Sequence, residues 1–289
     1  MGSRELVTTI TQLGFLHVSA SADFGPIIAL AVVAGVVLAG WRCARRKLFE
    51  GRETSVGIAA AVLLGAWVGC RLVPIAVSPE AYLRSPEALL GLFTSSAGAW
   101  YGAFLGGLCG LLLFCRRRRL PALGILDAVA PSVALGKTIG PFACLRAGCD
   151  HGVPAPEGLP WAVTYLGAGS AVDPALRGVP LHPAPLYDAA ANLAILAVIL
   201  AVESSLRRRG RSPAPGSVFA LYCLLYAPAR FVLEFWRGDA SRGFWLGGAL
   251  STSQFLSILV VAAVLAAALV RRAASSGAAG RALTRFGDT

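Results

Sequence analysis

Seven long apolar runs divide the chain, and short segments rich in arginine or proline separate them. A helix needs about 20 mostly apolar residues to cross the hydrocarbon core of a bilayer. The runs are continuous, whereas the strands of a membrane barrel would alternate in polarity. The pattern predicts an all-α polytopic membrane bundle of about seven transmembrane helices, over residues 24–41, 56–77, 98–115, 121–145, 184–203, 216–236 and 250–270.

Basic residues alternate along the connecting segments. Clusters of arginine and lysine occupy 42–52, 116–119, 207–211 and the C-terminal tail, while the other connections carry few. Basic loops face the cytoplasm, so we expect the N-terminus outside and the C-terminus inside. We expect one transmembrane domain over residues 1–272. Within it the Pro- and Gly-containing loop 146–182 forms an ordered arm at the outer face, with a short hairpin around Trp161 to Tyr165. Residues 273–289 are expected to form a loose cytoplasmic tail.

Composition agrees with a multi-span membrane protein, since 56% of the residues are hydrophobic and only 14% are charged. The formal net charge of +11 could indicate nucleic-acid binding in a soluble domain. Here the basic residues lie in short blocks at the ends of apolar runs, where they set topology. We therefore expect contact with membrane lipid and no nucleic-acid partner.

The sixth span carries the most informative polar residues, in the stretch YAPARFVLEFWRGD. Tyr226, Arg230 and Glu234 are spaced four apart and share one helix face, which Arg237 continues toward the outer surface. The Arg–Glu pair could simply neutralise itself. Alternatively, two arginines against one glutamate leave surplus positive charge, and a planar guanidinium suits the phosphate of a lipid headgroup.

Other ionisable residues lie inside the predicted spans, where such groups usually face a cavity or a partner. Arg71 either extends to the interface or contacts a headgroup. Asp127 is expected to pair with backbone donors or with the nearby basic loop. Lys137 lies deeper, and we expect a partner such as Glu234.

The motif HPAPLYD opens the fifth span at residues 182–188, and its prolines suit a helix entry. His182 and Tyr187 then lie at the outer surface. They are either a helix start with an interfacial tyrosine, or a headgroup contact and a proton-transfer group.

The stretch GPFACLRAGCDHG, residues 140–152, places Cys144, Cys149 and His151 at the outer end of the fourth span. Four interpretations remain open: a disulfide in an oxidising exterior, a zinc site completed by His182, a Cys–His nucleophile, or inert packing.

In order along the chain, GCRL (69–72), YGAFLGG (101–107), HPAPLYD (182–188), YAPARFVLEFWRGD (226–239) and LSTSQFLSI (250–258) resemble the motifs of the prolipoprotein diacylglyceryl transferase family. The resemblance implies a multi-pass enzyme of the bacterial inner membrane that uses no cofactor. It would transfer diacylglycerol from phosphatidylglycerol to the lipobox cysteine thiol of a preprolipoprotein at the outer face, and glycerol phosphate would leave. The expected catalytic residues are Arg230, Glu234, Tyr226, His182 and Tyr101. The expected substrate-binding residues are Arg71, Arg237, Lys137, Gly140, Gly148, Gly152, Tyr187 and Gln254.

Several polar residues of the family pattern are replaced in this chain. Tyr101 stands where the family has histidine, and Pro141 stands where it has arginine. Cys144 and Ala147 replace two asparagines, Cys149 replaces a glutamate, and Phe24 replaces a tyrosine, while Gly140, Gly148 and Gly152 are retained. Three alternatives follow. In the first, other residues restore the activity, with Lys137 or Arg146 for the arginine and His151 or His182 for the histidine. In the second, the chain is a paralogue that transfers lipid to another acceptor or by another route. In the third, it binds phospholipid or a membrane partner without transfer.

Overall fold

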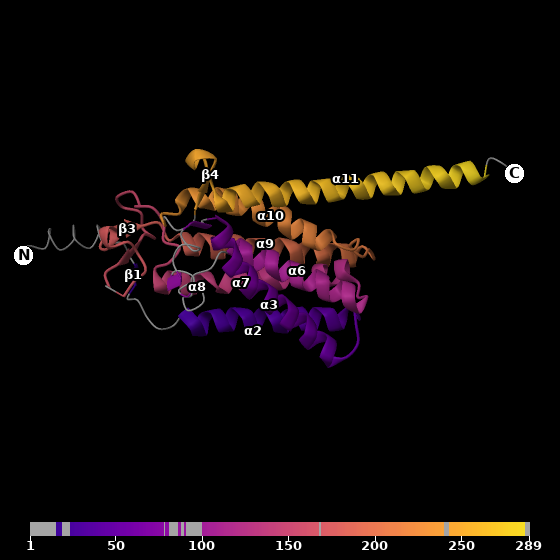
Figure 1. Ribbon diagram of the computed structural model, residues 1–289, viewed down its shortest axis with the longest axis horizontal. Coiled ribbons are helices and arrows are strands. Elements are labelled where there is room, and N and C mark those ends of the chain that lie inside the picture. The colour runs from indigo at the N-terminus through magenta and orange to yellow at the C-terminus, as the bar shows by residue number, and fades with distance from the viewer. Residues whose placement is uncertain are drawn as a thin grey trace, which may run out of the picture.

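The computed structural model describes residues 16–18, 24–77, 79–80, 86–87, 90, 100–167, 169–239 and 243–286. Its long helices lie alongside one another in one bundle (Figure 1), which confirms the all-α membrane class. They are α2 (Phe24–Arg45), α3 (Arg52–Val77), α6 (Trp100–Arg118), α7 (Ala122–Ile139), α9 (Ala184–Arg208), α10 (Ser217–Leu233) and α11 (Thr252–Phe286).

Six helical stretches in the described part of the chain are long and apolar enough to cross a membrane. They are Phe24–Arg45, Arg52–Val73, Ala122–Ala147, Ala184–Arg208, Ser217–Trp236 and Thr252–Ala273. The third predicted span, 98–115, corresponds to α6, and its first two residues lie outside the described residues. Helix α6 has 19 residues and ends in three arginines, so it lacks an apolar stretch of full spanning length.

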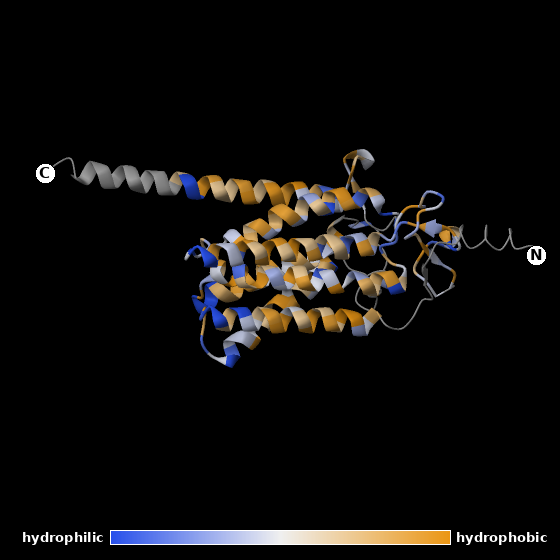
Figure 2. Ribbon diagram, turned by 180° about the vertical axis from the view of Figure 1, so that it is seen from behind, coloured by the Kyte–Doolittle hydropathy of each residue, from blue (hydrophilic) through white to orange (hydrophobic). Residues whose placement is uncertain are grey.

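The two ends of the bundle differ in polarity (Figure 2). Helices α2, α6 and α9 all finish with arginines in their last turn, and these turns define what we call the arginine end. The opposite end carries the loop 146–182 and is called the arm end. Which end faces the cytoplasm stays a prediction.

Helices α3 and α6 pack with their backbones in contact, as the small residues of the third predicted span suggest. A Cβ atom added to Gly69 would lie 2.1 Å from the carbonyl oxygen of Gly102. A Cβ added to Gly65 would lie 2.3 Å from the carbonyl oxygen of Gly106. No side chain fits at these positions, so glycine sets the distance between the helices.

Polar contacts fasten the helices at the arginine end. The buried carboxylate of Asp127 accepts backbone N–H groups of Gly216, at 2.7 Å, and Phe219, at 2.9 Å, which confirms the prediction of backbone donors. Arg42 donates to both carboxylate oxygens of Glu203, at 2.7 and 2.8 Å. These contacts tie α7 to the start of α10, and α2 to α9.

The arm is a small sheet beyond the helices. Its strands β1 (Leu16–Val18), β2 (Val163–Tyr165) and β3 (Pro180–Leu181) lie in that order, with β1 parallel and β3 antiparallel to β2. The 3₁₀ turn η1 (Pro174–Leu176) lies between β2 and β3. The short hairpin expected around Trp161–Tyr165 does not form. Strand β2 pairs instead with β1 and β3, which lie far from it along the chain.

Two short elements complete the arm end. Helix α8 (Pro141–Ala147) continues from α7 and ends at Gly148, whose φ of 78° is the left-handed conformation that favours glycine. A second hairpin, β4 (Phe244–Trp245) and β5 (Leu250–Ser251) joined by the turn η4 (Leu246–Gly248), leads into α11.

Helix α11 runs without interruption to Phe286, and the loose cytoplasmic tail expected over 273–289 stays a prediction. The segment is rich in alanine, the strongest helix former, and α11 runs on past the other helices (Figure 1).

Candidate functional site at the arm end

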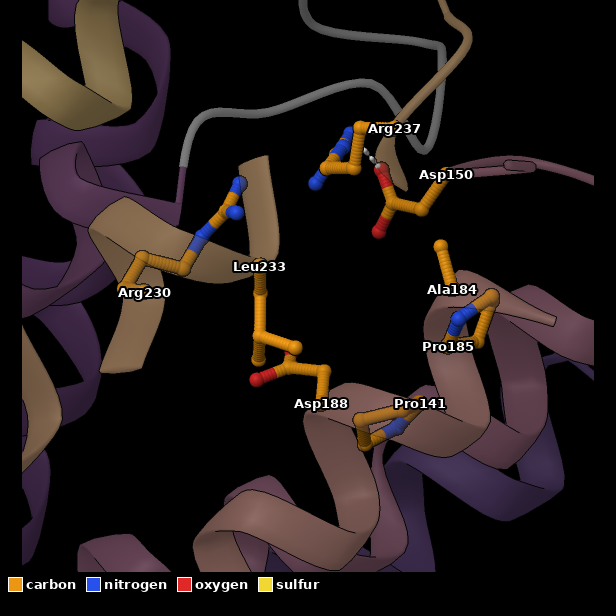
Figure 3. Close-up of a pocket in the computed structure, with 8 residues that line it drawn as sticks. All are labelled: Pro141, Asp150, Ala184, Pro185, Asp188, Arg230, Leu233 and Arg237. Carbon is orange, nitrogen blue, oxygen red and sulfur yellow. Dashed lines mark hydrogen bonds and ion pairs between the residues drawn. The ribbon is translucent and has the colours of Figure 1, made fainter. Parts of the chain in front are cut away.

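A pocket opens at the arm end where α8, α9 and the end of α10 meet (Figure 3). Guanidinium and carboxylate groups from separate segments surround it, next to a floor of prolines and aliphatic side chains. The lining residues are Pro141, Asp150, Ala184, Pro185, Asp188, Arg230, Leu233 and Arg237. The expected site residues Arg230 and Arg237 are thereby brought together.

Arg230 is buried in the last turn of α10 and is held from two sides. Its guanidinium forms a 2.5 Å ion pair with Glu234 one turn later, as the spacing predicts. A second nitrogen donates to the hydroxyl of Ser253 on α11, at 3.1 Å. Because the contacts use different nitrogens, they fix the plane of the guanidinium beside the pocket.

Arg237 does not continue the helix face, which corrects the sequence prediction. The helix tightens into the 3₁₀ turn η2 (Glu234–Trp236), and the backbone at Arg237 is extended, with φ of −83° and ψ of 136°. The guanidinium still reaches the pocket, where it donates to Asp150 at 2.5 Å and to both oxygens of Asp239 at 2.8 Å.

These ion pairs settle the charge states of Arg237 and Asp150. Burial alone would lower the pKa of Arg237, but Asp150 and Asp239 outweigh it and raise that pKa. Burial would likewise raise the pKa of Asp150, but the nearby groups, Arg237 first among them and then Cys144, Lys137 and Arg230, together outweigh it and lower that pKa. Both groups are therefore charged at neutral pH.

Lys137 pairs with Asp188 of α9, at 2.5 Å, and not with Glu234 as the sequence suggested. The physical reason is packing, since α7 lies against α9 along much of its length. The ammonium of Lys137 also lies 4.6 Å from the ring centre of Trp100. With Asp150, Asp188 and Asp239 present, the cations of the site have acidic partners, so the expected surplus of positive charge is not found.

An aromatic cluster lies beneath Arg230. Tyr226 stacks on Tyr222 at 5.5 Å and meets Trp100 and Tyr101 edge-on at 6.2 and 6.3 Å. Among the described residues, the buried hydroxyl oxygens of Tyr226 and Tyr222 and the indole nitrogen of Trp100 have no hydrogen-bond partner. Buried polar atoms normally have one, so this cluster offers hydrogen bonds to a bound molecule.

Tyr101, an expected catalytic residue, lies inside this cluster. Its hydroxyl shares a 2.6 Å hydrogen bond with Ser257 of α11. A phenol is a much weaker base than an imidazole. The hydroxyl of Tyr101 is therefore suited to positioning a group by a hydrogen bond, and its expected catalytic role stays a prediction.

His182 and Tyr187 are connected by hydrogen bonds beside the pocket. The indole of Trp161 donates to the hydroxyl of Tyr187 at 2.8 Å, and that hydroxyl lies 3.0 Å from Nδ1 of His182. Burial lowers the pKa of His182 below its ordinary value. Its imidazole is therefore neutral at pH 7 and can accept a proton.

The three retained glycines have different structural roles. Gly148 reverses the chain after α8. Gly152 lies where two loops cross, and a Cβ there would lie 2.1 Å from the carbonyl oxygen of His182. Gly140 has ordinary helical φ and ψ of −53° and −43° at the junction of α7 and α8. The glycines shape the arm end, and their expected role in substrate binding stays a prediction.

Gln254 and Arg71 lie away from the pocket lining. Gln254 accepts the backbone N–H of Ser251 at 3.0 Å, and its own N–H donates to the hydroxyl of Ser251 at 3.2 Å. This reciprocal capping box starts α11, on which Ser253 and Ser257 lie, and the expected contact of Gln254 with substrate stays a prediction. Arg71 lies on α3, a helix that contributes no residue to the lining of this pocket.

Cys144 and Cys149 are free thiols in the structure, so the disulfide alternative is not formed here. Within the described part of the chain, no three His, Cys, Asp or Glu residues gather as a metal site, which removes the arrangement proposed for Cys144, Cys149 and His151. The Nδ1 of His151 instead lies 3.1 Å from the carbonyl oxygen of Gly152.

Sequence reasoning did not name the acidic and hydroxyl residues that hold the cations, namely Asp150, Asp188, Asp239 and Ser253. Asp188 could have been found, because it is the acid that ends HPAPLYD. The others follow only from contacts between distant segments.

Comparison with known proteins gives one consistent family. Residues 9–270 match the family model described as prolipoprotein diacylglyceryl transferase. Curated proteins named phosphatidylglycerol–prolipoprotein diacylglyceryl transferase are similar over most of their length. The Clostridium tetani protein is 30% identical over 82% of this chain and 88% of its own. The Nitrobacter winogradskyi protein is 32% identical over 88% of both chains. The Methylocella silvestris protein is 34% identical over 82% of this chain and 86% of its own.

The family match spans the bundle, the arm and the elements that build the pocket, and it extends to most of the helix α11. The order of motifs from GCRL to LSTSQFLSI falls within the matched residues. The chain therefore belongs to the prolipoprotein diacylglyceryl transferase family.

Proposed function

We propose that this protein transfers the diacylglyceryl group of phosphatidylglycerol to the lipobox cysteine thiol of a preprolipoprotein, at the outer face of the bacterial inner membrane. The observation that carries the proposal is the pair of guanidinium groups, Arg230 and Arg237, bordering one pocket at the end of an apolar bundle (Figure 3). A phosphate bound there would have its diacylglycerol portion directed into the bundle.

The reaction replaces a carbon–oxygen bond with a carbon–sulfur bond. The thiol sulfur attacks the carbon of the diacylglyceryl group that is bonded to the phosphate oxygen. Glycerol phosphate leaves with the bonding electrons, and a base takes the thiol proton. Negative charge grows on the phosphate as that bond breaks, and fixed guanidinium groups stabilise such charge. Arg230 is preorganised for this role by Glu234 and Ser253.

Binding the phosphate requires Arg237 to share its donors with Asp150 and Asp239. A phosphate oxygen at the pocket would compete with Asp150, whose side chain is 43% exposed and can turn toward solvent. The buried Asp239 would keep the guanidinium in place during this exchange. The acidic partners therefore hold the arginines ready until substrate arrives.

His182 is the base in this proposal, because it is neutral at pH 7 and lies beside the pocket next to Ala184. Tyr187 holds the imidazole through its hydroxyl. Tyr226 donates its unpartnered hydroxyl to an ester oxygen of the bound lipid, and Lys137 and Asp188 keep α7 and α9 aligned around it.

A reconstituted assay tests the proposal directly. Purified protein in vesicles containing phosphatidylglycerol labelled in its acyl chains is mixed with a lipobox peptide, and label on the peptide thiol is measured. Wild type should transfer label, and Arg230→Ala should reduce the rate roughly 100-fold or more, because a fixed donor to developing charge is lost. The matched control Arg208→Ala, an exposed arginine at the arginine end, should retain the wild-type rate.

Absence of transfer by wild type, in vesicles where the Clostridium tetani relative transfers label to the same peptide, would contradict the proposal. Retention of labelled phosphatidylglycerol without turnover in that experiment would identify a lipid-binding member of the family instead.

A further inference from the structure

Three hydrogen-bond donors without acceptors lie together below the pocket. The buried hydroxyls of Tyr222 and Tyr226 and the buried indole N–H of Trp100 find no partner among the residues that the structure describes. Tyr222 is 0% exposed and Tyr226 is 4% exposed, so bulk solvent does not reach them. A buried donor without a partner destabilises a fold, and three such donors in one cluster therefore indicate a place where a bound molecule supplies the acceptors.

The donors follow the helix face that begins at the phosphate end of the site. Arg230, Tyr226 and Tyr222 are four residues apart on α10, so they share a face in steps of about 6 Å. Arg230 lines the pocket. Tyr222 stacks on Tyr226 at 5.5 Å, and Trp100 of α6 meets the ring of Tyr226 edge-on at 6.2 Å. The face thus leads from the pocket into the apolar bundle.

The surroundings of Tyr222 are otherwise apolar. It belongs to a buried cluster with Ile195, Ile199 and Val218, and its ring lies 6.4 Å from that of Phe104. A molecule that suits both the donors and these surroundings combines hydrogen-bond acceptors with an apolar body. The ester end of an acyl chain has this composition.

We propose that Tyr222 and Trp100 bind the ester carbonyls of the lipid and make the site selective for ester-linked over ether-linked phosphatidylglycerol. An indole N–H only donates and an ester carbonyl only accepts, so the two match. The ester groups lie a few bonds from the phosphate, and a lipid whose phosphate lies at Arg230 places them along the face below it. The inference rests on the proposed function, in which Tyr226 already holds one ester oxygen, and adds the linkage that the site recognises.

An ether lipid separates this role from general binding of lipid. Dialkyl phosphatidylglycerol has the same phosphate and the same chains but lacks both carbonyl oxygens. Its binding leaves the hydroxyl of Tyr222 and the indole of Trp100 without acceptors, and a site built to hydrogen-bond a group discriminates against an analogue that lacks it. The carbon bonded to the phosphate oxygen is the same in both lipids, so the comparison isolates the ester groups.

Competition binding to the full-length protein in detergent micelles tests the proposal. Labelled diester phosphatidylglycerol is displaced by unlabelled diester or dialkyl lipid of the same chain length. Wild type should need about 10-fold more of the dialkyl lipid. Tyr222→Phe keeps the ring and removes the hydroxyl, so the ratio should fall to about 3-fold or less. Trp100→Phe removes the indole donor and should lower the ratio in the same direction.

The matched control is Tyr165→Phe in β2, because this hydroxyl already donates to the carbonyl oxygen of Leu145 at 3.0 Å. The control should keep the wild-type ratio, whereas a change that follows lost stability alone would appear in it too. Equal displacement by the two lipids in wild type, or an unchanged ratio in Tyr222→Phe, overturns the inference. Wild type that binds neither lipid overturns it as well. A preference for the ester lipid without transfer of label to a lipobox peptide supports the inference and counts against the proposed transfer alone.

Discussion

Lys137 of α7 and Asp188 of α9 form a 2.5 Å ion pair inside the bundle, and the same aspartate lines the pocket at the arm end. The pair thus connects the packing of two membrane helices to the shape of the site. Its side chains are only 13% and 20% exposed, so neither charge is well solvated when its partner is missing.

Removing one member of this pair should destabilise the protein more than removing both. Lys137→Met leaves Asp188 uncompensated, which costs up to about 3 kcal/mol for a buried pair, whereas Lys137→Met with Asp188→Leu replaces both charges by apolar groups. Thermal unfolding in detergent should rank wild type and the double variant above either single variant. Equal or additive losses would show that the pair contributes no coupling.

Replacing Arg230 by lysine should be nearly as harmful as replacing it by alanine. One ammonium cannot reproduce the separate contacts with Glu234 and Ser253 that fix the guanidinium plane. We expect a fall of roughly 100-fold in kcat. Ser253→Ala removes one hydrogen bond and should cost about 10-fold or less. Kinetics in vesicles checks both variants, with Arg208→Lys as the control. A rate close to wild type in Arg230→Lys would show that the two separate guanidinium contacts are not required.

The pH dependence of transfer should have an acid limb set by His182. Burial disfavours the imidazolium, so its pKa lies below the ordinary value of about 6.5. The neutral base therefore persists as pH falls through 6.5 and is lost only below it. The kcat/KM profile should show a midpoint below 6.5 that disappears in His182→Gln. A limb centred above 6.5, or one unchanged in the variant, would assign the base elsewhere.

Gly152→Ala should disrupt the arm by lack of space. The new Cβ would lie 2.1 Å from the carbonyl oxygen of His182, and backbone must move to admit it. Overpacking of this kind costs roughly 1–3 kcal/mol. Gly40→Ala on α2, where a Cβ would meet nothing within 4 Å, is the control and should be neutral or slightly stabilising. Thermal unfolding and transfer rate should both fall in the first variant alone.

Apolar run length and helical spacing predicted the helices and the Arg230–Glu234 contact, because both depend on residues close in sequence. Spacing places Lys137 on a face of its helix but does not say which helix lies opposite, so the partner Glu234 was wrong and Asp188 is correct. The departure of Arg237 from the helix was missed for the same reason. Its loop pairs with Gly152, a contact between segments 85 residues apart (237 − 152).

The sequence also contains a local pattern that indicates a structural role for Gln254. Ser251 and Gln254 have the spacing of a capping box, a local signal that predicts the start of α11. In contrast, neither Cys144 nor Cys149 indicates by its position in the sequence whether it is oxidised, and both are free thiols in the structure.

The glycine contact between α3 and α6 limits how a lipid can reach the site. Where Gly65 and Gly69 touch the backbone of the facing helix, an acyl chain has no room to pass without separating the two helices entirely. Phospholipid must therefore enter and the lipidated product must leave through another face of the bundle. A crosslink that joins α3 to α6 along this seam should leave turnover intact.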